Sequence, residues 1–137
     1  MNKNKYLLRT MMFVPGHIEK LMYKASESEA DALVFDLEDS CKPDSNKDVA
    51  RKIIKETVGT GIFEKFEVFV RINPRNTGFL FKDVSELTIK GIDGFLYPVA
   101  KSRGDIIFFS NLLTEIELFK GFEPGLFKIF PVIETAG

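Results

Sequence analysis

The 137-residue chain has no tryptophan, one cysteine, one histidine and almost no net charge. A single cysteine excludes an internal disulfide framework, and we find no apolar segment of signal-peptide or membrane-spanning type. We therefore expect a cytoplasmic protein with no membrane partner. Nineteen basic residues against 20 acidic ones leave a formal charge of −1 at pH 7, so no overall field favours nucleic acid as a partner. Without internal repeats or a low-complexity linker, residues 1–137 are expected to form a single domain.

Short apolar runs alternate along the chain with segments of helical periodicity. Four segments with helical spacing of apolar residues begin near His17, Ser45, Leu80 and Ser102. We expect helix caps at Ser45 and Ser102, because an aspartate follows each serine three positions later. Runs typical of β-strands occupy five segments, namely 7–14, 32–38, 67–73, 94–99 and 128–134. This order predicts a parallel sheet with crossover helices.

Such a sheet can stay open or close into a barrel. An open doubly wound sheet normally carries a glycine-rich phosphate turn after its first strand, and Pro15-Gly16-His17 is not such a turn. A (β/α)8 TIM barrel instead carries functional residues where several strands end, as this chain does at Pro15, Asp36, Glu38, Arg71, Asn73, Pro98 and Glu134. We therefore predict an α/β fold, a TIM barrel of which the chain covers about the first five strands. A complete barrel needs about 250 residues, so we expect an incomplete barrel from a longer enzyme.

The segment Ala32–Asp39 ends in a cluster of carboxylates. Alternation along the strand places Asp36 and Glu38 on one face and three apolar side chains on the other. Charge on an inward face costs free energy unless a cation or hydrogen-bond donors meet it. The sequence therefore predicts a functional site at the end of this strand.

Five motifs follow one another along the chain: Arg9-Thr10-x-x-Phe13-Val14-Pro15-Gly16, Asp36-Leu37-Glu38-Asp39, Lys47-x-x-Ala50-Arg51, Val70-Arg71-Ile72-Asn73-Pro74 and Ile133-Glu134-Thr135-Ala136. In series they resemble the citrate lyase beta-subunit family of the HpcH/HpaI aldolase superfamily, from about residue 7 to the last residue. One departure is Pro98-Val99-Ala100-Lys101, where relatives usually carry Pro-Lys-x-Glu. This segment lacks the lysine of the relatives and carries a lysine in place of their glutamate. The resemblance is therefore weaker support for assigning the substrate of any one relative to this chain.

The resemblance implies a homo-oligomeric barrel, often a trimer, that makes or breaks a carbon–carbon bond with Mg2+ as cofactor. Its small-molecule substrates would be oxo-acids or acyl-CoA thioesters such as citryl-CoA and malyl-CoA. Carried over by position, Arg71 would hold a substrate carboxylate and Glu134 would bind Mg2+. Glu38 and Asp39 would line or brace the site as catalytic candidates. Further substrate-binding candidates are Arg9, Pro15, Gly16 and Asp36.

The residue types suit that reaction on chemical grounds as well. Cleavage beta to a carbonyl generates an enolate, which needs a cation near the oxyanion and a donor that fixes the departing oxo-acid. Mg2+ held by Glu134 and one further acid would supply the cation. The second acid would lie beyond this chain, so we expect the 137 residues to be inactive alone. Arg71 would supply the donor, because its planar fork binds a carboxylate through two parallel hydrogen bonds.

The sequence leaves structural alternatives open. Arg71 could form an ion pair with Asp36 or Glu38, Asp39 could bond its own loop, and Glu134 could be an ordinary strand-end acid. Cys41 has no basic partner nearby in sequence and is expected to be an inert thiol. Two other functions also stay open: a non-catalytic remnant or binding subunit, and a CoA-independent aldolase acting on pyruvate-type oxo-acids.

Overall fold

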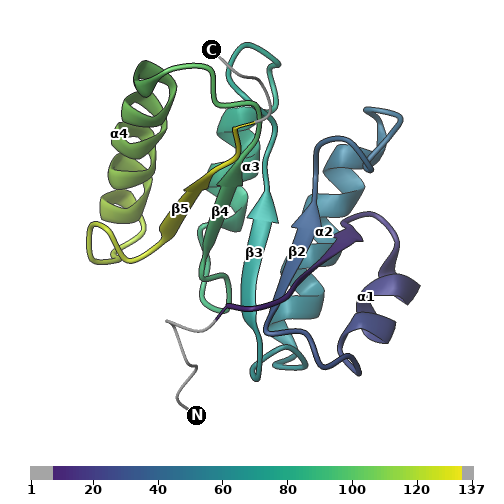
Figure 1. Cartoon of the computed structure of the whole chain (residues 1–137). Helices are drawn as coiled ribbons and strands as arrows, with labels where there is room; N and C mark the ends of the chain where they lie inside the picture. Colours follow the sequence, from purple (N-terminus) through teal and green to yellow (C-terminus); the bar gives the residue numbers. More distant parts are fainter. Residues whose placement is uncertain (1–7, 134–137) are drawn as a thin grey trace.

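The computed structural model describes residues 8–133 of the chain, which form one parallel sheet with helices between its strands (Figure 1). The strand order β1-β2-β3-β4-β5 follows the sequence, so each crossover joins neighbouring strands. Within residues 8–133, five strands and four helices confirm the predicted order of elements. Their bounds are β1 Met11–Pro15, α1 Glu19–Ala25, β2 Ala32–Asp36, α2 Asn46–Gly59, β3 Glu67–Arg71, α3 Leu80–Leu87, β4 Gly94–Tyr97, α4 Arg103–Phe119 and β5 Lys128–Pro131.

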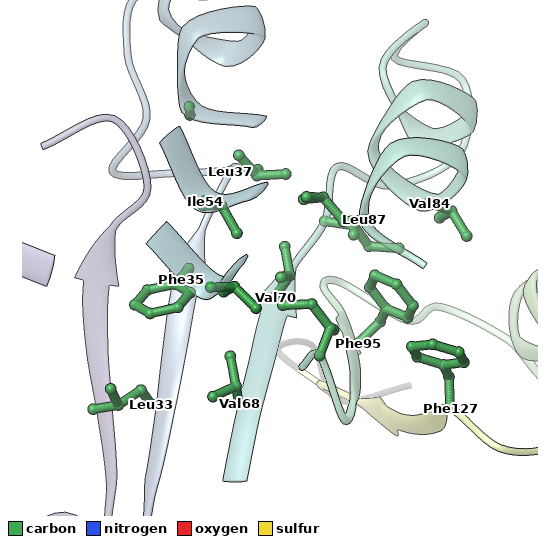
Figure 2. Close-up of a cluster of buried hydrophobic side chains, with 14 of the residues drawn as sticks. Leu33, Phe35, Leu37, Ile54, Val68, Val70, Val84, Leu87, Phe95 and Phe127 are labelled. Carbon is green, nitrogen blue, oxygen red and sulfur yellow. The ribbon is translucent and has the colours of Figure 1, made fainter. Parts of the chain in front are cut away.

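The main hydrophobic core lies between the sheet and the helices. Figure 2 shows side chains of β2, β3 and β4 packed against Ile54 of α2 and against Val84 and Leu87 of α3, and these three helical residues are fully buried. Full burial of such side chains contributes about 1.5–3 kcal/mol each. The strand residues in this core alternate with residues of the other face, and they are Val14, Leu33, Phe35, Val68, Val70, Phe95 and Tyr97.

The second face of the sheet carries a smaller apolar cluster with no helical member, made of Ala32, Val34, Phe69 and Leu96. The ring of Phe69 also meets that of Phe130 edge-on, with 5.1 Å between centroids. One row of directly paired residues crosses this face at the carboxyl ends of the strands, and its members are Pro15, Asp36, Arg71, Leu96 and Phe130. The register therefore brings Asp36 and Arg71 side by side.

Two glycines permit close backbone approaches in the sheet. The N–H of Gly16 donates to the carbonyl of Asp36 at 2.9 Å, and a Cβ on Gly16 would lie 2.9 Å from that same oxygen. A Cβ on Gly94 would lie 2.3 Å from the carbonyl oxygen of Lys128, where β4 and β5 pair. A larger residue at either position would push backbone apart, since real Cβ atoms essentially never approach this closely.

The predicted helix caps have different outcomes. Ser102 caps α4 as expected, because its Oγ accepts the N–H of Asp105 at 3.3 Å. The prediction for Ser45 is wrong: its backbone is already helical, with φ −60° and ψ −19°, and its side chain makes no cap hydrogen bond. A preceding turn, in which the Asn46 N–H donates to the Pro43 carbonyl, satisfies that helix start instead. Across residues 8–133, no helix combines the length and apolar character needed to cross a bilayer.

Candidate active site at the carboxyl end of the sheet

A bidentate ion pair between Arg71 and Asp36 forms the centre of the site. Nε of Arg71 donates to Oδ1 of Asp36 at 2.8 Å, and Nη2 donates to Oδ2 at 2.6 Å. Asp36 is the last residue of β2 and is 1% exposed, whereas the Arg71 side chain is 16% exposed. Adjacent strand ends thus present a buried carboxylate and a partly accessible guanidinium to the same space.

Asp36 accepts three more hydrogen bonds from the segment that follows β2. The N–H of Glu38 donates to Oδ1 at 2.8 Å, while the N–H and Oγ of Ser40 donate to Oδ2 at 2.9 and 2.5 Å. Burial raises the pKa of Asp36, but hydrogen bonds from Arg71 and Ser40 outweigh burial and lower the pKa to about 2. Asp36 is therefore an ionised anchor whose lone pairs are engaged.

The guanidinium of Arg71 keeps one edge for another partner. Asp36 occupies the Nε/Nη2 edge, and within residues 8–133 Nη1 of Arg71 donates no hydrogen bond. The ring of Phe13 lies against the guanidinium, with 5.1 Å between Cζ and the ring centroid. Held by the anchor and the ring, the Nη1/Nη2 end of Arg71 can bind a second carboxylate through parallel hydrogen bonds.

Glu38 is a half-buried acid without the set of hydrogen-bond donors that surrounds Asp36. Its Oε1 lies 3.8 Å from Nε of Arg71 and has no hydrogen-bond partner within the described part of the chain. Burial, together with the hydrogen bond and charge of the exposed Asp39, raises the pKa of Glu38 to about 7. A carboxyl group with such a pKa can both hold and release a proton at neutral pH.

The other predicted site residues divide into three groups. Pro15 and Gly16 border the site, because Pro15 pairs with Asp36 and the Gly16 N–H bonds its carbonyl. Arg9 does not join them: it precedes β1, at the opposite end of the strand, and its backbone N–H donates to Asp31 at 2.8 Å. The structure therefore does not bring Arg9 together with Asp36 and Arg71. Glu134 lies outside the described residues.

Sequence interpretation missed two contributors to this site. Ser40 stabilises the charge of Asp36 from four positions along the chain, a local spacing that could have indicated it. The contact between Phe13 and Arg71 follows from strand register, for which the sequence carries no direct signal. Cys41 is buried, and burial raises the pKa of its thiol, which agrees with an inert side chain.

The acids beside Arg71 are suited to the neighbourhood of a hard cation. Glu38 and Asp39 offer carboxylate oxygens, the donor type that Mg2+ prefers, and a cation would relieve the repulsion between them. Asp36 is not available, because five hydrogen bonds engage it. Among residues 8–133, no three His, Cys, Asp or Glu side chains are grouped so that they could hold a metal ion. Any metal site here would therefore need at least one ligand from elsewhere.

Comparisons with known proteins show which family the chain resembles. Residues 9–137 match the family model described as HpcH/HpaI aldolase/citrate lyase. The chain is 30% identical over 129 residues to citrate lyase subunit beta of Haemophilus influenzae, covering 94% of this chain and 44% of that relative. It is 35% identical over 133 residues to the L-malyl-CoA/beta-methylmalyl-CoA lyase of Rhodobacter capsulatus, covering 95% and 41%. The chain thus spans less than half the length of these curated relatives.

Solved structures give the same result for the fold. The citrate lyase beta subunit of M. tuberculosis, complexed with oxaloacetate and magnesium, superposes with a TM-score of 0.67 at 22% identity, over 92% of this chain and 47% of that one. A magnesium/glyoxylate complex of Haloferax volcanii malate synthase gives 0.85 at 20% identity, over 98% and 45%. Because these neighbours are TIM-barrel-like, they confirm the prediction of an incomplete barrel. The chain belongs to the HpcH/HpaI aldolase/citrate lyase family.

Proposed function

We propose that the chain is part of a Mg2+-dependent carbon–carbon lyase that cleaves or forms hydroxyacyl thioesters of the citryl-CoA or malyl-CoA type. Two curated relatives are a citrate lyase subunit and a malyl-CoA lyase, so the lyase class is supported from outside the chain. Within the chain, one observation carries the proposal. Arg71 is fixed by Asp36 along one edge and offers its other edge at the carboxyl end of the sheet.

Arg71 would bind the carboxylate of the oxo-acid that leaves or attacks. Two parallel hydrogen bonds from Nη1 and Nη2 would fix the orientation of that carboxylate, and the charge would favour it electrostatically. The Asp36 anchor prevents the guanidinium from rotating away between turnovers, because both oxygens of Asp36 hold it. Preorganisation of this kind lowers the entropy cost of placing the reacting carbon atoms.

Glu38 would take the proton from the substrate hydroxyl as the carbon–carbon bond breaks and its electron pair forms the enolate, and it would return that proton to the same oxygen in the synthetic direction. Its pKa of about 7 lies near neutral pH, where general acid–base catalysis is most efficient. Asp39 contributes by raising that pKa through its hydrogen bond and its charge. Because Asp39 is exposed, it would brace the site from the solvent side.

Mg2+ would supply the positive charge that stabilises an enolate oxygen. Glu134 is the proposed ligand in this chain, on the resemblance given above, and the carboxylates of Glu38 and Asp39 suit the surroundings of the ion. The M. tuberculosis relative solved with oxaloacetate and magnesium supports this choice of ion and substrate class.

Calorimetric titration with oxaloacetate, with and without Mg2+, tests the proposal. Arg71→Ala should weaken binding at least tenfold, because a hydrogen bond to a charged group is worth about 1.5–3 kcal/mol. Arg75→Ala is the matched control: this arginine follows the same strand but bonds Asp105 at 3.0 Å, away from the Asp36 anchor. Equal binding by the parent and Arg71→Ala would refute the role of Arg71.

A turnover assay separates the CoA-dependent reaction from its alternatives. Citryl-CoA and malyl-CoA would be compared with the free hydroxy-acids in the presence of Mg2+, using a longer protein that contains this chain. Cleavage of the free acids at equal rates would favour a pyruvate-type aldolase. Binding of oxaloacetate with no turnover of any substrate would favour a binding subunit.

A further inference from the structure

The motif Lys47-x-x-Ala50-Arg51 takes no part in the site described above, yet its two cations are almost completely buried. Lys47 is 1% exposed and Arg51 is 2% exposed. Both lie on α2. Removing such charges from water costs several kcal/mol each unless specific partners meet them. Their partners therefore indicate what the motif does.

Lys47 joins the segments that follow β2 and β3. Its Nζ donates to the carbonyl of Leu37 at 2.6 Å and to Oδ1 of Asn73 at 2.9 Å, and lies 3.4 Å from the carbonyl of Glu38. The ring of Phe79 lies 5.3 Å from the ammonium. The Lys47 side chain thus binds the main-chain carbonyls of Leu37 and Glu38 and the side-chain amide oxygen of Asn73.

Asn73 carries the connection onward to α3. Its backbone N–H and Nδ2 both donate to Oδ2 of Asp83, at 2.9 and 2.7 Å. Asp83 is fully buried, and its Oδ1 accepts Nη1 of Arg51 at 2.6 Å. Because every member is anchored on a helix or a strand end, the ammonium of Lys47 has a fixed position.

We propose that Lys47 is the positioning residue of this site, holding Glu38 beside Arg71 through the carbonyls of Leu37 and Glu38. With those carbonyls bound on the α2 side, the N–H of Glu38 faces Asp36, to which it donates at 2.8 Å. The side chain of Glu38 is then kept half-buried next to the guanidinium. This inference rests on the proposed role of Glu38, and it assigns a function to a motif that the proposed reaction leaves without one.

The readout is the titration of Glu38 in the ligand-free protein, which needs neither substrate nor activity. Its carboxyl carbon would be followed by 13C NMR and assigned by its loss in Glu38→Gln. In Lys47→Met the released segment should turn Glu38 toward water, so its pKa should fall from about 7 by at least about one unit. Lys55→Met is the matched control, because Lys55 lies two turns later on α2 and is half-exposed beside Glu86. It should leave the titration unchanged.

The direction of the shift separates three roles of Lys47. A fall supports positioning. A rise would mean that Lys47 acts on Glu38 only through its charge, since loss of a cation disfavours the carboxylate. No change would mean that Lys47 supports the fold alone, and either of these results would overturn the proposal. Loss of oxaloacetate binding would bear on the proposed function and would leave this test intact.

A second pair of proteins keeps the test valid if Lys47→Met does not fold. In a Cys41→Ala background, Lys47→Cys would be alkylated while unfolded with 2-bromoethylamine or with 3-bromopropylamine and then refolded. The first product restores the length of lysine, and the second is one methylene longer with the same charge. We expect Glu38 to titrate near 7 in the first and lower in the second. Equal titration in both would refute positioning.

Discussion

Glu38→Gln should stabilise the protein at neutral and alkaline pH while removing its proton-transfer group. The pKa of Glu38 is raised from 4.5 to about 7, chiefly by burial and then by Asp39. Each pKa unit corresponds to about 1.4 kcal/mol, and we discount the product because the side chain is 16% exposed. A glutamine keeps the shape without the charge, so the gain in unfolding free energy should reach about 2–3 kcal/mol.

The pH dependence of that gain follows from the direction of the shift. Below pH 4.5 Glu38 is protonated in both the folded and the unfolded chain, so parent and variant should be almost equally stable. Between pH 4.5 and about 7 only the unfolded chain loses the proton, and the parent loses stability progressively. Above pH 7 the difference should stay constant at its full value.

Urea unfolding followed by circular dichroism at half-unit steps from pH 4 to pH 8 measures this difference. Asp39→Asn is the control, because removing that acid should lower the pKa of Glu38 and flatten the profile. A difference that is the same at pH 4 and pH 8 would refute the reasoning. A variant less stable than the parent at pH 8 would do so as well, since it would mean that the ionised carboxylate is held favourably.

Three further substitutions have defined outcomes in unfolding experiments. Arg71→Ala should cost about 3–5 kcal/mol at pH 7, because Asp36 stays buried without its partner. That loss should shrink as the pH falls from 3.8 toward about 2, where the parent also loses the benefit of ionised Asp36; a loss independent of pH would contradict the ion pair. Gly16→Ala should cost about 1–3 kcal/mol, since its Cβ would press on the Asp36 carbonyl at 2.9 Å. Gly94→Ala should cost at least as much, because a Cβ 2.3 Å from the carbonyl of Lys128 separates β4 from β5; unchanged melting temperatures would refute either glycine argument.

The alternation of apolar and polar residues, together with the Pro and Gly residues between segments, was sufficient to locate the strands. The residues at which the strands end depended on polar contacts. The strand expected over 67–73 appears as β3, Glu67–Arg71. Ile72 still donates its N–H to the carbonyl of Leu96 in β4, and the chain turns away at Asn73, which bonds Asp83. The first strand begins later than expected, at Met11. Arg9 and Thr10 instead donate their backbone N–H groups to the side chain of Asp31. Such side-chain contacts join residues that are 10 to 22 positions apart, and local periodicity contains no information about them.

The sequence also predicted that the acids and Arg71 lie together at the carboxyl ends of the strands. It did not predict which acid pairs with Arg71. Asp36 and Glu38 lie on the same face by alternation, so both were open as partners of Arg71. Strand register decided between them, because Asp36 is the direct neighbour of Arg71 across β2 and β3. The partners of Lys47 were inaccessible for another reason: they include main-chain carbonyls, which every residue possesses.

Two carboxylates two positions apart differ in pKa because donors face only one of them. Asp36 accepts five hydrogen bonds, two from Arg71 and three from the segment after β2, and its pKa falls to about 2 although it is buried. The N–H of Glu38 donates to Asp36, whereas Oε1 of Glu38 accepts no hydrogen bond within residues 8–133. Separation of two acids in this way is the general means by which a site keeps one ionised and the other able to transfer a proton. Substitution of Ser40 by alanine should therefore raise the pKa of Asp36 and weaken its hold on Arg71 without supplying Glu38 with a donor.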